Sequence, residues 1–359
     1  KLSEEGIGVS LYSVREKRQI AGLNDDALFV LASNAKLFTT AAALLKLSPA
    51  YRFRTILHRT GEADAAGTLK GDIVVIGGGD PNISGRFHEE DPTAVFKRWA
   101  AALRKEGIQC VAGDIVLDAK IFDDEFRHPS WEEYGKGQWW TAPVAGLSLN
   151  DNCIDLTVTG AASAGGRPKV LMSPPTASLS IVNKVKTSSK KSRNAVSFDC
   201  ADDGTISLTG EIGAARSASF SVAVNDPVSY FGAVLKETFE REGIRVTGNV
   251  KVNGAYPADG LTAITEYQSE LIPTLTIANR NSQNFYADSL LKLLGNRFGD
   301  VGQGLSYIPA DLGIASIYFR VYTADGAYTN HLPSTTYQAQ RDDIRGRINL
   351  LGYAGWSGP

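Results

Sequence analysis

The chain has no long uninterrupted run of apolar residues, whereas a helix that spans a membrane needs about 20 of them in succession. Its three cysteines form no Cys-x-x-Cys pair, so they can hold at most one disulfide bond. Its four histidines lack the spacing of a helical metal site, and we expect neither a metal nor another cofactor. A net charge of −2 gives no general attraction to nucleic acid. We therefore expect no transmembrane segment, no disulfide scaffold and no nucleic-acid partner.

Methionine is nearly absent as well. The only one is Met172, and the chain begins at Lys1. Removal of a secretory signal peptide and trimming of the gene both explain this start. With 359 residues, of which 43% are hydrophobic and 21% charged, the composition is that of a globular protein of two or three domains.

What the chain does contain is a serine followed three residues later by a lysine, at the start of a helical stretch. Ser33-Asn34-Ala35-Lys36 precedes the apolar run 37–45. Side chains three residues apart on a helix project from the same face. A serine hydroxyl is a poor nucleophile unless a neighbouring base takes its proton, and Lys36 can be that base. The helix start would also stabilise negative charge through its exposed N–H groups.

The tetrapeptide alone also fits a helix with a serine N-cap and a lysine in its first turn. Its surroundings favour the catalytic interpretation. Residues 29–44 closely resemble the nucleophile segment of the penicillin-binding D-alanyl-D-alanine carboxypeptidase/endopeptidase family, the low-molecular-mass class C penicillin-binding proteins. The order and spacing of segments stay similar to that family as far as about Ser306. The segments that carry this further resemblance are 51–55, 67–81 and 142–152.

The resemblance implies a serine enzyme of the cell wall that acts outside the cytoplasm, its signal peptide being absent from this chain. Its partners would be peptidoglycan stem peptides, cut between two D-alanines through an acyl-enzyme on Ser33. β-Lactams would be covalent inhibitors, because they present a strained amide and a carboxylate in a similar arrangement. Carboxypeptidase and endopeptidase activity both fit.

Enzymes of this superfamily resemble one another in a second element, Ser-x-Asn, for which the sequence offers two candidates. Ser148-Leu149-Asn150 matches literally but lies in a stretch that resembles an insert segment of the family. Ser282-Gln283-Asn284 matches the catalytic segment, and we choose it. The Ser282 hydroxyl can relay a proton to the leaving amine, and the Asn284 amide can orient the substrate. A polar turn that caps the next helix is the alternative.

The third element of the superfamily, Lys-Thr-Gly, occurs nowhere in the chain, and no lysine follows Lys292. Lys186-Thr187-Ser188 is similar but precedes Ser282, so chain order argues against it. Residues 344–356 faintly resemble the strand that carries the motif, with Ile344 at the position of the lysine. There Arg345 is our candidate for binding the substrate carboxylate, with Arg347 as the other choice. A divergent tail or a shifted reading frame after Ser306 would explain the loss.

We predict an α+β fold, a β-lactamase/transpeptidase-like serine domain split by a large inserted module that is itself α+β and β-rich. The serine acyl-transferase domain would comprise residues 1–62 and 262–359, and the insert residues 63–261. Within the insert, residues 153–224 form a β-rich subdomain. The insert contains two similar stretches, around Arg104 to Ile108 and around Glu240 to Ile244. Each of them predicts a helix, a glycine C-cap and a strand.

Two other functions stay open. A β-lactamase or esterase of the same superfamily would turn over its acyl-enzyme quickly, although the long insert argues against it. A catalytically impaired wall-peptide binding protein would explain the missing Lys-Thr-Gly. Trp139 and Trp140 can stack on sugar rings, but packing between the insert and the catalytic domain explains them as well.

Overall fold

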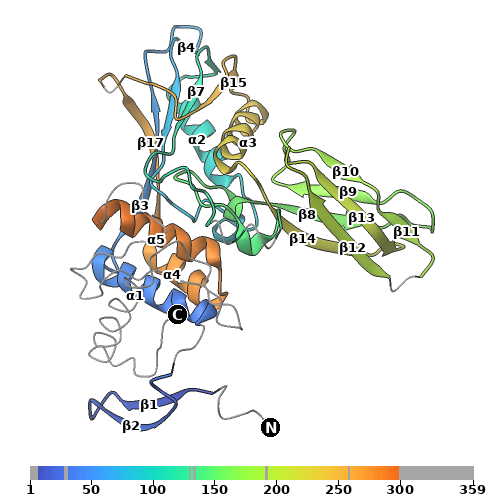
Figure 1. Cartoon of the computed structure of the whole chain (residues 1–359). Helices are drawn as coiled ribbons and strands as arrows, with labels where there is room; N and C mark the ends of the chain where they lie inside the picture. Colours follow the sequence, from blue (N-terminus) through green and yellow to red (C-terminus); the bar gives the residue numbers. More distant parts are fainter. Residues whose placement is uncertain are drawn as a thin grey trace. The chain divides into compact units, whose positions relative to one another are not determined.

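The computed structural model describes residues 7–27, 31–128, 131, 135–190, 193–257 and 259–298. These residues form two compact units, each of which is described by itself (Figure 1). Unit 1 holds the described parts of residues 1–49, together with 278–282 and 290–298, and unit 2 holds 50–277 and 283–289. Among the described helices, none is both long enough and apolar enough to cross a membrane.

Unit 1 contains helix α1, Ala35–Leu47, and the antiparallel hairpin of β1, Val9–Ser13, and β2, Arg18–Leu23. Helix α1 is amphipathic and buries Phe38, Ala42 and Ala43 on one face. The end of α4 (Leu271–Arg280) and most of α5 (Asn284–Phe298) also belong to this unit.

Unit 2 is built around a five-stranded sheet of order β16-β7-β5-β3-β17. The central strand β5 and its neighbour β7 are apolar and buried, as strands covered on both faces are. The outer β17 pairs antiparallel with β3 along its whole length. A second, smaller sheet has the order β15-β6-β4. The strands of these sheets are β3 (Arg52–Arg59), β4 (Thr68–Leu69), β5 (Ile73–Ile76), β6 (Cys110–Val111), β7 (Ile115–Asp118), β15 (Arg245–Val246), β16 (Val250–Val252) and β17 (Thr262–Glu270).

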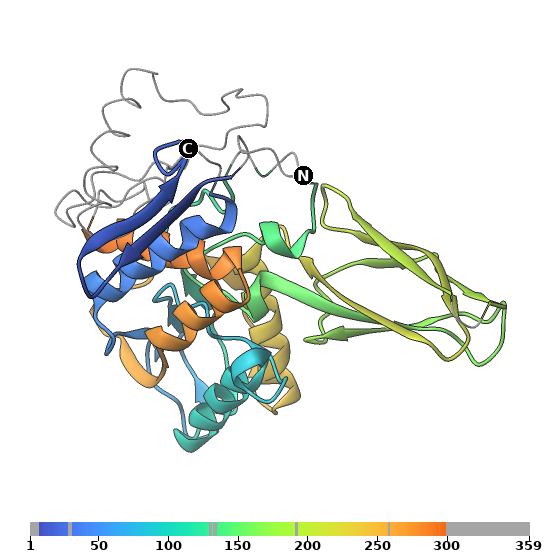
Figure 2. The same cartoon turned by 90° about the horizontal axis from the view of Figure 1, so that it is seen from below.

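Helices α2, Ala94–Lys105, and α3, Pro227–Arg241, lie side by side against these sheets (Figures 1 and 2). The rings of Phe96 and Phe231 meet edge to face, with their centroids 4.8 Å apart. A glycine with positive φ follows two residues after the end of each helix, and the residue after this glycine closes the turn by donating its N–H back to the helix. The strands that follow are parallel neighbours, β6 beside β15 and β7 beside β16. The repeated order of helix, glycine and strand that the sequence predicts is confirmed.

The described residues of the stretch 153–223 are all strands and loops, in two sheets that extend from the rest of unit 2 (Figure 2). One sheet has the order β14-β8-β9, and in the other β13 pairs with β10, β11 and β12. This is the stretch for which the sequence predicts a β-rich subdomain. Its strands are β8 (Cys153–Thr159), β9 (Lys169–Ser173), β10 (Ile181–Asn183), β11 (Lys186–Ser188), β12 (Asn194–Cys200), β13 (Ile206–Gly213) and β14 (Ser217–Ala223). The predicted domain boundaries near residues 62 and 262 stay predictions.

Candidate functional site

Ser33 lies in a short 3-10 turn, Ala32–Asn34, that runs directly into α1. The turn is entered through Ala32, whose φ of 46° is uncommon for a residue with a side chain. Such backbone conformations cost energy and persist where the surrounding structure fixes them, which is common at functional sites. Ser33 is exposed to solvent. The turn therefore presents its hydroxyl at the start of the amphipathic helix α1.

The side chains of Ser33 and Lys36 meet, as their spacing predicts. Lys36 Nζ donates a hydrogen bond to Ser33 Oγ across 2.9 Å. Lys36 is only 8% exposed, although lysine is rarely buried unless it has partners. The alternative interpretation, a helix N-cap, does not describe Ser33: the N-cap of α1 is Asn34, and it makes no side-chain capping bond. This geometry suits a serine nucleophile and its base, and these two roles stay predictions.

A threonine hydroxyl connects the lysine backbone to the end of α4. Thr40 Oγ1 donates to the Lys36 carbonyl oxygen at 2.9 Å and accepts from Asn279 Nδ2 at 3.0 Å. Asn279 stands three residues before Ser282, and all of these residues belong to unit 1. Ser282 is exposed, with a φ of 55°. The segment that we predict to carry the second motif is therefore anchored to the helix that carries the first.

Asn284 belongs to unit 2 and begins α5. Its Nδ2 donates to the backbone carbonyl of Trp140 at 2.7 Å. A side-chain amide has two N–H groups, so one remains for a substrate carbonyl. This contact fixes the orientation of the amide. The roles of Ser282 and Asn284 in catalysis stay predictions.

The rejected motif candidates lie in other surroundings. Ser148 is buried in unit 2, where it donates to the carbonyl of Ala145 at 3.1 Å and accepts from Asn152 at 3.0 Å. Lys186-Thr187-Ser188 forms strand β11 of the β-rich sheets, with Thr187 buried. Our candidate Arg345, like Arg347, lies outside the described residues, and its role stays a prediction.

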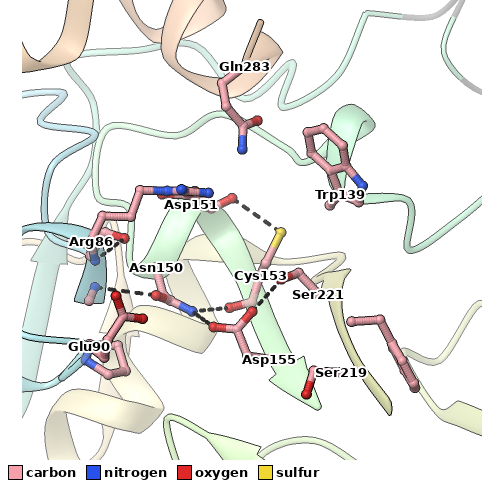
Figure 3. A pocket seen from close by; sticks show the side chains of 14 residues that line it. Arg86, Glu90, Trp139, Asn150, Asp151, Cys153, Asp155, Ser219, Ser221 and Gln283 are labelled. Atoms are coloured by element: carbon pink, nitrogen blue, oxygen red, sulfur yellow. Dashed lines mark hydrogen bonds and ion pairs between the residues drawn. The ribbon is translucent and has the colours of Figure 1, made fainter. Parts of the chain in front are cut away.

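Unit 2 also contains a buried polar network that sequence reasoning missed (Figure 3). Asp151 accepts from Arg86 Nε at 2.8 Å and from the Tyr286 hydroxyl at 2.7 Å. Burial disfavours the charged guanidinium, but the facing Asp151 carboxylate outweighs this effect, so the pKa of Arg86 lies above its ordinary value. Burial, and then the same carboxylate, raise the pKa of Tyr286. The run Asn150-Asp151-Asn152 was a signal in the sequence for an unusual turn at this place. Asparagine and aspartate tolerate the left-handed conformation, which all three residues adopt.

The network lines a cavity of about 590 Å³ whose wall includes Gln283, the middle residue of Ser282-Gln283-Asn284. Burial raises the pKa of Cys153, another residue of the wall, so its thiol is neutral. Within the described parts of the chain, no group of three or more histidine, cysteine or acidic residues could hold a metal ion.

Comparison with known proteins agrees with this geometry. A model of the D-Ala-D-Ala carboxypeptidase 3 (S13) family matches residues 1–319. The chain belongs to this family. This finding confirms the family that the segment around Ser33 predicts.

Two curated proteins are similar to this S13 family member over most of its length. The D-alanyl-D-alanine carboxypeptidase of Actinomadura sp. (strain R39) is 28% identical over 282 residues, which are 76% of this chain and 50% of that protein. The D-alanyl-D-alanine carboxypeptidase DacB of Haemophilus influenzae is 24% identical over 297 residues, which are 81% of this chain and 60% of that protein. The chain thus spans only half to six-tenths of the length of these relatives.

The fold has a counterpart among solved structures. The crystal structure of penicillin-binding protein 4 (dacB) from Haemophilus influenzae matches with a TM-score of 0.66 and 23% identity, over 80% of this chain and 62% of that one. The same protein in complex with a β-lactam matches with a TM-score of 0.61. The predicted α+β, transpeptidase-like fold with an inserted module is confirmed.

Proposed function

We propose that this chain is a serine-type D-alanyl-D-alanine carboxypeptidase/endopeptidase that acts on peptidoglycan stem peptides outside the cytoplasm. The observation that carries the proposal is the 2.9 Å hydrogen bond between Lys36 Nζ and Ser33 Oγ. Membership of the S13 family and the names of the two curated relatives support the choice of substrate.

In the proposed reaction, Ser33 Oγ attacks the carbonyl carbon between two D-alanines while its proton passes to an unprotonated Lys36. Backbone N–H groups, including that of Ser33, stabilise the oxyanion. The C–N bond then breaks, and the leaving amine takes up that proton through the Ser282 hydroxyl. Water hydrolyses the ester, which restores the serine and releases the shortened peptide.

The test combines a peptide substrate with a labelled penicillin. We expect D-alanine to be released from an acylated peptide that ends in two D-alanines, and a stable penicillin adduct to form on Ser33. Rapid penicillin hydrolysis without a stable adduct would indicate a β-lactamase. Absence of both adduct and D-alanine would indicate a wall-peptide binding protein, and either result would overturn the proposal.

A further inference from the structure

The cavity of unit 2 is of the size that small-molecule sites have, about 300 to 1,000 Å³. Its wall includes the aromatic side chain of Trp139, and other wall residues carry carboxylates and hydroxyls. Figure 3 shows Trp139, Ser221 and Ser219 on one side and Arg86 and Glu90 on the other. The proposed reaction uses none of these side chains.

The aromatic side chain of the cavity wall, that of Trp139, is held in place and accessible. Trp139 is 39% exposed, and its ring meets that of Trp140 edge to face at 5.7 Å. The backbone of Trp140 is in turn bonded to Asn284. Phe220 alternates with Ser219 and Ser221 along β14, so its ring lies on the opposite face of the strand, where it stacks on Phe198 with ring centroids 5.5 Å apart. A flat ligand with an apolar face can pack on the Trp139 ring at little entropic cost.

The acidic walls keep capacity to accept hydrogen bonds. Asp155 accepts from two neutral donors, Asn150 Nδ2 at 2.8 Å and Ser221 Oγ. A carboxylate has about four acceptor sites, so Asp155 can accept further bonds. Asp151, by contrast, is already engaged by Arg86 and a tyrosine. Glu90 is exposed at the cavity wall.

A row of hydroxyls leads away from the cavity along the β14–β8 pair. Ser221, Ser219 and Ser217 of β14 stand opposite Asp155, Thr157 and Thr159 of β8. The hydroxyls of Thr157 and Ser219 lie 2.9 Å apart, as do those of Thr159 and Ser217. Each hydroxyl both donates and accepts, so the row suits a ligand that carries hydroxyls of its own.

We propose that the cavity and this hydroxyl row bind the glycan strand of the wall polymer, a neutral chain of N-acetylated amino sugars. The inference rests on the proposed function, since such a strand carries the stem peptide. A sugar ring offers an apolar face to Trp139 and hydroxyls to Asp155 and the serines. It can therefore contact the aromatic, the acidic and the hydroxyl side chains of the wall. An ammonium ligand would use the acids alone. Gln283 in the cavity wall follows Ser282 directly, which places bound glycan beside the second motif.

Isothermal titration of the whole chain with a tetramer of N-acetylglucosamine tests the inference. We expect saturable binding by the wild type that Trp139→Ala weakens about tenfold, because a stacking partner is lost. Trp140→Phe is the matched control. Residue 140 lies on the same turn but outside the cavity wall, and phenylalanine keeps an aromatic partner for Trp139, so binding should persist.

The deacetylated, cationic tetramer identifies the ligand class. We expect the wild type to bind the cationic tetramer no more tightly than the N-acetylated one. We also expect Glu90→Gln to change the binding of either tetramer little. The inference is overturned if the wild type binds neither tetramer or if Trp139→Ala binds as the wild type does. It is equally overturned if the cationic tetramer binds far more tightly with a steep salt dependence, because the site would then recognise amines.

Penicillin acylation of the same samples separates this inference from the proposed function. A chain that is acylated on Ser33 but binds no tetramer would overturn the glycan site alone. A chain that binds the tetramer but is not acylated would overturn the proposed enzyme, while the site would stand as that of a glycan-binding protein.

Discussion

The amine of Lys36 and the hydroxyl of Ser33 are hydrogen-bonded at 2.9 Å, with the lysine buried and the serine exposed. The proposed base is thus held within the structure while the proposed nucleophile faces solvent, where a substrate can reach it. This arrangement depends on the turn at Ala32–Asn34, which places Ser33 one helical turn before Lys36 without making it a cap.

Replacing the base tests its role directly. We expect Lys36→Gln to slow acylation by penicillin about 10² to 10⁴-fold, the usual contribution of general base catalysis. The matched control is Lys46→Gln, on the same helix, where the amine lies over the ring of Phe298. Stopped-flow acylation rates provide the measurement. Equal rates for the two variants would contradict a catalytic role for Lys36.

The connection from Thr40 to Asn279 predicts an energetic coupling. Thr40→Val leaves the side-chain volume nearly constant. It removes the hydroxyl that bonds both the Lys36 carbonyl and Asn279. We expect Thr40→Val and Asn279→Ala each to lower the free energy of unfolding, and their double-mutant cycle to give about 1 kcal/mol of coupling. Urea denaturation of the four proteins measures it. Strictly additive effects would show that the bond contributes nothing.

A buried aspartate predicts a pH dependence of stability in unit 2. Asp80 Oδ1 accepts from Ser269 Oγ at 2.7 Å and from Asn82 N at 2.8 Å, while Oδ2 is buried with no hydrogen-bond partner among the described residues. Burial raises the pKa of Asp80 from 3.8 to about 6. Folding therefore favours the protonated carboxyl of Asp80. Its contribution to the free energy of unfolding is full below pH 3.8 and is lost as the pH rises through about 6.

Asp80→Asn removes this titration and keeps an acceptor for both donors. Relative to this variant, we expect the wild type to lose about 3 kcal/mol of unfolding free energy between pH 3.8 and pH 7. Urea denaturation at a series of pH values gives the difference curve. A flat curve would mean that the pKa of Asp80 is the same in the folded and unfolded states, and would contradict the prediction.

Two tyrosines of unit 2 allow a matched comparison of charged and neutral acceptors. Tyr286 donates to the Asp151 carboxylate at 2.7 Å, and Tyr230 donates to the Cys153 carbonyl at 3.2 Å. We expect Tyr286→Phe to lower the free energy of unfolding by about 1.5 to 3 kcal/mol and Tyr230→Phe by about 1 kcal/mol. Chemical denaturation measures both. The reverse order would indicate that Arg86 alone satisfies Asp151.

The sequence could predict features that depend on local periodicity. Ser33 and Lys36 are one helical turn apart, so their meeting follows from helix geometry. The two helices that end at Gly107 and Gly243 could be predicted because a glycine is the residue that best adopts the left-handed C-cap.

Long-range pairing could not be predicted in the same way. Arg86 and Asp151 are 65 residues apart, and nothing in either segment specifies the other. The contact of Asn284 with the backbone of Trp140 is equally invisible in the sequence, since a backbone carbonyl carries no residue identity. The cavity arises from several such pairings at once, and only the fold brings its walls together.

Peptide mapping by mass spectrometry after treatment with penicillin tests the central claim most directly. The account predicts one penicilloyl group per chain, on the peptide that contains Ser33, and none on Ser33→Ala under the same conditions. An adduct on another residue, an adduct that persists in Ser33→Ala, or an unmodified wild-type chain would contradict it.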